Sequence, residues 1–126
     1  MAERLTREEL TARLLSLPDL EAQEELLRAN VPLLDSHLAS ALKEKANDYL
    51  WSDIHRSQEM AHLILVLADL TGEPADRALG LLAQANTHCI GLAEYSTAIE
   101  RYEEAAEIYA RQGRVVEQAR AQVGKI

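Results

Sequence analysis

The chain has 126 residues, of which 48% are hydrophobic, 27% are charged and only 4% are aromatic, with a net charge of −8. This length suits one domain with its own core, and the composition excludes an intrinsically disordered chain. The acidic charge argues against nucleic acid and anionic membranes as partners. Leu, Ala and Glu are abundant, and because these residues favour helices, the composition predicts an all-α fold.

No sequence feature indicates export or insertion into a membrane. Cys89 is the single cysteine, so an internal disulfide cannot form. The first residues are charged and lack the apolar core of a signal peptide. The longest apolar run covers residues 63–68, which is too short to span a bilayer. We therefore expect a cytoplasmic protein.

The first two predicted helices are short and rich in leucine. Thr6 and Glu9 have the spacing of a capping box, which opens a helix that Pro18 ends. A second helix is predicted over residues 19–28, before Asn30 and Pro32. Their apolar faces are expected to consist of Leu10, Leu14, Leu15, Leu17, Leu20, Ala22, Leu26 and Leu27.

The next two predicted helices are longer. The third covers residues 35–51, and the fourth begins after the capping residue Asp53 and ends at Gly72. Residues 63–68 are apolar on every side of this fourth helix. A surface helix has one polar side, so this pattern predicts a helix with neighbours on both flanks, as in a stacked array.

Three further helices complete the chain. A fifth follows Pro74 over residues 75–90, a sixth covers 96–112, and a seventh runs from Val115 to the last residue, Ile126. No segment alternates apolar and polar residues as a half-buried strand does. We therefore expect about seven helices and no strands.

The last four helices contain a repeat. Gly72 and Gly113 lie 41 residues apart, and at this offset Ala78 aligns with Ala119. Leu82 aligns with Val123 in the same way, so small and apolar residues match residues of the same kind. A repeat of this length indicates helix pairs that stack on one another.

Residues 75–112 resemble a tetratricopeptide (TPR) repeat. Ala98, Tyr102 and Ala105 match the small, aromatic and small residues of its second helix, and Tyr95 matches its turn tyrosine. Leu82 suits the apolar position of the first helix, whereas Ala85, Asn86 and Cys89 depart from the pattern. The resemblance implies antiparallel helix hairpins stacked as a short right-handed α-solenoid. It also places Leu82, Ala98, Tyr102 and Ala105 in the packing between helices.

The resemblance divides a single helical-repeat domain, 1–126, into four parts. These are an N-terminal helical cap (1–33), a degenerate helix pair (34–72), a TPR-like repeat (73–113) and the first helix of a truncated next repeat (114–126). Residues 14–19 and 42–53, followed by the repeat, resemble the N-terminal region of large bacterial TPR proteins that often carry a protease-like CHAT domain. Nothing of that protease is present, and the unfinished last helix suggests self-association.

The resemblance also predicts a concave groove for a partner. Gly80, Ala83, Gln84, Thr87 and Gly91 are expected to line it, and their small side chains would admit a helix or an extended peptide. An equally weighted alternative is a shallow groove, or one filled by another part of the array. In some TPR proteins, groove Lys and Asn residues clamp a C-terminal carboxylate, and we expect such residues to be absent.

Other candidate sites are interpreted as structural. His55, Glu59 and His62 share one helix face and are competent zinc ligands, but we expect a solvated face and no metal or cofactor. Cys89 is assigned to the core, and Tyr109 is expected to present its hydroxyl to solvent.

The sequence therefore predicts a protein–protein interaction module of a larger bacterial protein, with an unidentified protein or peptide partner. It contains no phosphate loop and no Ser–His–Asp arrangement, and we expect no enzyme activity. The alternative is a purely structural module that self-associates or packs within its own chain. Nucleic acid and membranes are not expected as partners, whereas a homo-oligomer through the last helix is possible.

Overall fold

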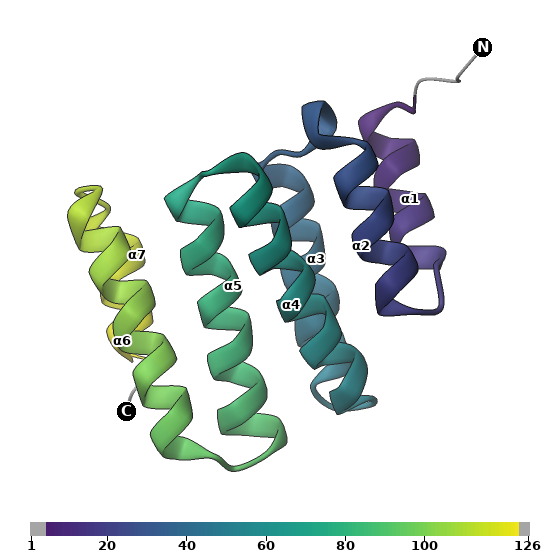
Figure 1. The fold of residues 1–126 in the computed structure, drawn as a ribbon. Helices are drawn as coiled ribbons and strands as arrows, with labels where there is room; N and C mark the ends of the chain where they lie inside the picture. The colour runs from purple at the N-terminus through teal and green to yellow at the C-terminus, as the bar shows by residue number, and fades with distance from the viewer. Residues whose placement is uncertain (1–4, 124–126) are drawn as a thin grey trace.

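The computed structural model describes residues 5–123, and every regular element in that range is helical (Figure 1). The prediction of an all-α chain is therefore confirmed. None of the helices between residues 5 and 123 is long and apolar enough to cross a membrane. The predicted last turn, residues 124–126, lies outside the described range. The α-helices are α1 Arg7–Ser16, α2 Leu20–Ala29, α3 Ser36–Tyr49, α4 Ile54–Thr71, α5 Pro74–Asn86, α6 Tyr95–Arg111 and α7 Val115–Val123.

Local side-chain bonds set most helix starts. Both bonds of the predicted capping box are present, since Glu9 N donates to Thr6 Oγ1 at 3.1 Å and Thr6 N donates to Glu9 Oε1 at 3.2 Å. These bonds satisfy N–H groups that have no partner within the helix. At the starts of α2, α3 and α4, an aspartate side chain accepts the equivalent hydrogen bond from a backbone N–H. These aspartates are Asp19, Asp35 and Asp53.

Glycines end the long helices where the sequence predicts. Gly72 follows α4 with φ +72° and Gly113 follows α6 with φ +69°, a conformation that costs glycine little. Between them, α5 ends at Asn86 rather than at the predicted residue 90, and a π turn, η2 (Thr87–Gly91), continues the chain. This wider turn changes the direction of the chain before α6.

Helices pack mainly on their neighbours along the chain. α4 contacts α2, α3 and α5, while α5 contacts α3, α4 and α6, and α7 packs on α6. Figure 1 shows the pairs α1–α2, α3–α4 and α5–α6 side by side, with α7 beside α6. The described N- and C-terminal helices therefore lie at opposite sides of the molecule.

Helix α4 has eight buried residues, more than any other described helix. Met60, Leu63, Ile64 and Leu67 are fully buried in a cluster that joins α1, α2, α3 and α4. Leu65, on the opposite side of the helix, packs against a second cluster built by α5, α6 and α7. The prediction that α4 has neighbours on both flanks is confirmed.

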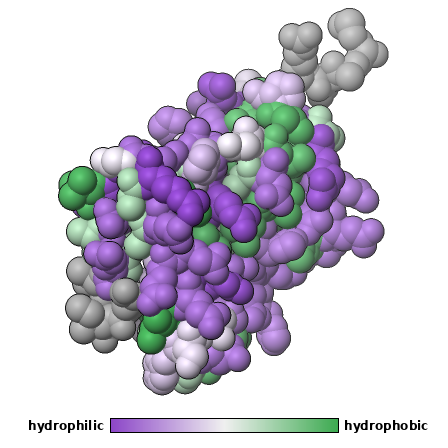
Figure 2. Space-filling model, turned by 60° about the vertical axis from the view of Figure 1, so that its left-hand side comes forward, coloured by the Kyte–Doolittle hydropathy of each residue, from purple (hydrophilic) through white to green (hydrophobic). Residues whose placement is uncertain are grey.

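The surface turned forward in Figure 2 is mostly hydrophilic, with separate hydrophobic areas near the edges of the view. This agrees with the net charge of −8. Such a charge keeps a helical protein soluble and does not by itself identify a partner.

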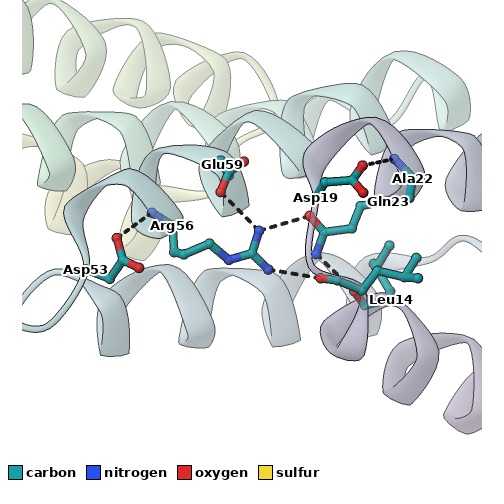
Figure 3. A network of polar contacts seen from close by, with 8 residues as sticks. Leu14, Asp19, Ala22, Gln23, Asp53, Arg56 and Glu59 are labelled. Carbon is teal, nitrogen blue, oxygen red and sulfur yellow. Dashed lines mark hydrogen bonds and ion pairs between the residues drawn. The ribbon is translucent and has the colours of Figure 1, made fainter.

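One arginine fixes the N-terminal helix pair to α4 (Figure 3). Arg56 Nη2 donates to the carbonyl oxygen of Leu17 at 3.3 Å, and Nη1 donates to Gln23 Oε1 at 3.3 Å and to Glu59 at 3.0 Å. Gln23 is fully buried and donates in turn to the carbonyl oxygen of Leu14 at 2.9 Å. The guanidinium therefore satisfies partly buried acceptors from the α1–α2 connection and from α2.

Candidate functional site

The face of α5 that was predicted to line a groove packs against α4 instead. Ala83 and Thr87 are each 1% exposed. A Cβ atom at Gly80 would lie 2.7 Å from Leu65 Cδ2, so Gly80 allows the two helices to approach closely. The prediction of an open groove is wrong for Gly80, Ala83 and Thr87, because their small size serves helix packing.

The other two predicted groove residues are less buried, since Gly91 is exposed. Gln84 is half-buried. Gly91 lies in η2, where a Cβ atom would meet Ile54 Cδ1 at 1.8 Å. Gly91 therefore brings the α5–α6 connection directly onto the first residue of α4.

The open surface lies on a different face of α5, between α3 and α7. On α3, Ser36, Ser40, Lys43 and Asn47 have the spacing of one helix face. A hollow of about 170 Å³ at one end is lined by residues of α3, α5, α6 and the start of α7. We call this the α3–α5–α7 surface, and its accessible residues are Ser36, Ser40, Lys43, Asn47, Leu79, Asn86 and Glu117. The buried residues Asp76, Tyr102 and Tyr109 lie next to it.

A chain of polar contacts marks one end of this surface. Lys43 Nζ donates to Asn47 Oδ1 at 3.4 Å, and Asn86 Nδ2 donates to the same oxygen at 3.5 Å. Tyr102 donates its hydroxyl hydrogen to Asn86 Oδ1 at 2.6 Å. Helices α3, α5 and α6 thus bring an amine, two amides and a phenol together.

The amine in this cluster lacks a counter-charge. Burial lowers the pKa of Lys43 from its usual value of 10.5. Within residues 5–123, Lys43 forms no ion pair with a carboxylate. A partly desolvated ammonium with only amide contacts is well suited to a bound anion, because a carboxylate would supply the missing charge.

The opposite end of the surface is acidic. Asp76 is 2% exposed and accepts a hydrogen bond from Ser36 Oγ at 2.9 Å. Burial raises the pKa of Asp76, and the nearby carboxylates of Glu73 and Asp35 raise it further, against the hydrogen bond from Ser36. Glu117 lines the same hollow. Arg114 lines the hollow as well, so this end holds two carboxylates and one guanidinium.

Lys43, Asn47 and Asn86 meet on the α3–α5–α7 surface, and the groove prediction did not include any of them. A signal for them exists in the sequence. Lys43 and Asn47 lie four residues apart on one helix, and Asn86 is one of the departures from the TPR pattern. Neither signal shows by itself that the two helices lie side by side.

The predicted packing residues lie in the interior. Ala98 and Ala105 are 1% and 0% exposed, Tyr102 is 6% exposed, and Leu82 packs against both of their clusters. The expectation of a solvent-facing Tyr109 is wrong, because it is 4% exposed and Arg114 lies over its ring. Tyr95 is largely exposed, and Cys89 is half-buried beside Ala98 and Tyr102.

His55, Glu59 and His62 line a common shallow hollow, as their spacing predicts. However, Glu59 pairs with Arg56 (Figure 3), and His62 Nε2 lies 2.6 Å from Glu24 Oε1. In the part of the chain that the structure describes, no group of three His, Cys, Asp or Glu side chains is placed to hold a metal ion.

Comparisons with protein families, curated proteins and solved structures found no match for this chain. The site is therefore interpreted from its own geometry. The ammonium of Lys43 and the amide groups of Asn47 and Asn86 are the donors near its cationic end. Such donors are suited to holding a carboxylate, so the arrangement supports the binding of an anionic group.

Lys43→Met is expected to raise the midpoint of urea unfolding at pH 7. The variant keeps most of the buried stem but removes the desolvated charge. Because the folded state lowers the pKa of Lys43, it binds this proton less well than the unfolded chain. The free energy of unfolding of the wild type therefore increases as the pH rises toward 10.5, because Lys43 loses its proton more readily in the folded state. The difference in stability between Lys43→Met and wild type should become smaller over the same pH range.

The matched control for this prediction is Lys45→Met, which removes an equal charge from another side of α3. Urea unfolding of the three proteins at pH 7 and pH 9.5, followed by circular dichroism, tests the prediction. A Lys43→Met protein less stable than wild type at pH 7 would show that the amine stabilises the fold.

Proposed function

We propose that the chain is a protein–protein interaction module built as a TPR-like α-solenoid, and that it binds its partner on the α3–α5–α7 surface. Two observations support this architecture. Helix α5 packs on both members of the preceding pair, α3 and α4, as stacked hairpins require. The residues on which the TPR resemblance rests, Ala98, Tyr102 and Ala105, are buried where α6 packs on its neighbours.

The position of Lys43 supports a partner that carries an anionic segment. An acidic segment could place a carboxylate on Lys43 and accept further hydrogen bonds from the amide of Asn47 or Asn86. Desolvation already present in the free protein lowers the cost of forming this contact. The proposed partner is therefore a protein with an exposed Asp- and Glu-rich segment.

A second candidate is the purely structural module, which self-associates. The observation that favours it is the exposure of Val115 and Val116, which are 72% and 60% exposed on α7. An apolar helix face of this kind can pack on a second copy. Sedimentation at nanomolar protein concentration separates the candidates, because only this one requires a persistent oligomer.

The first candidate is tested with immobilised wild-type, Lys43→Met and Lys45→Met proteins. Proteins retained from a lysate of the source organism are identified by mass spectrometry, and their acidic segments are synthesised as labelled peptides. We expect a peptide that binds wild type and Lys45→Met similarly and Lys43→Met about tenfold more weakly, as measured by fluorescence anisotropy.

Two results would reject the acidic-partner proposal. One is equal binding of every captured segment to all three proteins. The other is recovery of only the module itself, together with an oligomeric mass in solution, which would support the structural candidate.

A further inference from the structure

Two connections expose large apolar side chains at the same end of the molecule. Trp51, between α3 and α4, is 80% exposed. Ile90, Leu92 and Tyr95, at the α5–α6 connection, are 44%, 38% and 62% exposed. Figure 1 places both connections at the lower end of the helices. We call these four residues the tip patch.

The α5–α6 connection contacts the start of α4, directly after the α3–α4 connection. Gly91, between Ile90 and Leu92, lies against Ile54, three residues beyond Trp51. The apolar surface also continues along α6, because Ile99 lies one turn after Tyr95 and is 38% exposed. Exposed Trp and Tyr side chains that gather with aliphatic residues are typical of protein-binding surfaces.

The surroundings of the tip patch are acidic. Residues 48–55 and 88–100 contain four carboxylates and neither Lys nor Arg, and the adjacent Arg56 and Arg101 are paired with Glu59 and Glu104. One of the four carboxylates, Glu94, lies 2.9 Å from His88 Nδ1. All four of these acidic residues are exposed, namely Asp48, Asp53, Glu94 and Glu100. The patch is thus an apolar surface with a negatively charged rim.

We propose that the tip patch docks a basic amphipathic helix of a partner protein. The apolar face of that helix would cover Trp51, Leu92 and Tyr95, and its Lys and Arg residues would lie over the surrounding carboxylates. A second copy of this chain would bring two acidic rims together, and an anionic bilayer would meet the same repulsion. The observed charge therefore favours a basic partner.

This proposal does not depend on the α3–α5–α7 surface. That surface presents Lys43 to an acidic segment, whereas the tip patch selects the opposite charge. Lys43→Met is therefore expected to leave docking at the tip patch unchanged, so the failure of one proposal is distinguishable from the failure of the other.

The chain carries its own reporter for this test, because Trp51 is its single tryptophan. The probe is a synthetic helix of about 18 residues with Leu at positions i, i+3, i+4 and i+7 and Lys elsewhere. A matched peptide carries Glu in place of every Lys. We expect the Lys peptide to shift Trp51 emission to shorter wavelength, with an affinity that falls as salt rises, and the Glu peptide to produce no shift.

Paired substitutions locate the contact. Leu92→Ser combined with Tyr95→Ser is expected to weaken binding of the Lys peptide at least tenfold while Trp51 remains as the reporter. Val115→Ser combined with Val116→Ser, which removes exposed apolar residues from α7, is expected to leave the affinity unchanged. Circular dichroism of both variants establishes that the helices are intact.

Four results would overturn the proposal. The first two are equal binding of the Lys and Glu peptides, and equal effects of the two pairs of substitutions. The third is the absence of any shift of Trp51 emission when the Lys peptide is added. The fourth is a shift of Trp51 emission without peptide, at protein concentrations where the mass in solution also increases. The last result would assign the patch to a second copy. A shift with phosphatidylcholine vesicles but not with the Lys peptide would assign it to a lipid surface.

Discussion

Replacing Arg56 by alanine is expected to lower the free energy of unfolding by about 2–4 kcal/mol. The guanidinium donates to Gln23 Oε1 and to the carbonyl oxygen of Leu17, and Gln23 is fully buried. Without the arginine, these acceptors lose their donor in a place that water reaches poorly. The loss should be concentrated where the α1–α2 pair meets α4, because the bonds of Arg56 join these parts (Figure 3).

Urea unfolding followed by circular dichroism measures this effect. The control is Arg77→Ala, since Arg77 is half-exposed and its nitrogen lies 3.8 Å from Asp69. This exposed pair should contribute no more than about 0.5 kcal/mol. Similar losses in the two variants would show that the Arg56 network adds no more stability than an ordinary surface ion pair.

Leu63→Ala is expected to destabilise the protein by roughly 3 kcal/mol or more. Leu63 is fully buried in the cluster that joins α4 to α1, α2 and α3. Removing its side-chain atoms leaves a cavity that the surrounding helices can fill only in part.

The same unfolding measurement tests this prediction. Val116→Ala also shortens an aliphatic side chain, but Val116 is 60% exposed on α7. Its effect should stay within about 0.5 kcal/mol. If Leu63→Ala were equally mild, the packing around α4 would have to be loose enough to close the cavity at little cost.

The helices and most of their ends were predictable because their signals are local, whereas the end of α5 at Asn86 was not. The Thr6–Glu9 capping box, Asp53 before α4 and Gly72 after it each act within one helical turn. The position of α4 between neighbours was also predictable, since residues 63–68 are apolar on every side. These features do not depend on how distant helices are arranged.

The face of α5 that is open to a partner was not predictable in the same way. Gly80 and Ala83 were interpreted as space for a ligand, but their small size is used by the close approach of α4. In the sequence, small residues look the same whether they line an open groove or allow a second helix to pack closely. Only the position of α3 and α4 beside α5 decides which face remains open.

Polar partners that are far apart in sequence were missed for a related reason. Gln23 lies among apolar residues of α2, and its partner Arg56 is 33 residues away. Asn47 and Asn86 are 39 residues apart and meet only because α3 packs on α5. Likewise, Glu59 pairs with Arg56 and His62 pairs with Glu24. The spacing of His55, Glu59 and His62 along the helix does not reveal these pairs.

The packing of most helices on their sequence neighbours has a consequence for how the chain reaches this structure. The mean separation of contacting residues is small in such an arrangement, and proteins of low contact order fold quickly. Because α4 holds neighbours on both flanks while α1 and α7 lie at the ends, the ends can open as separate cooperative units. Partly open forms would therefore keep the central hairpins and expose new surface at the ends.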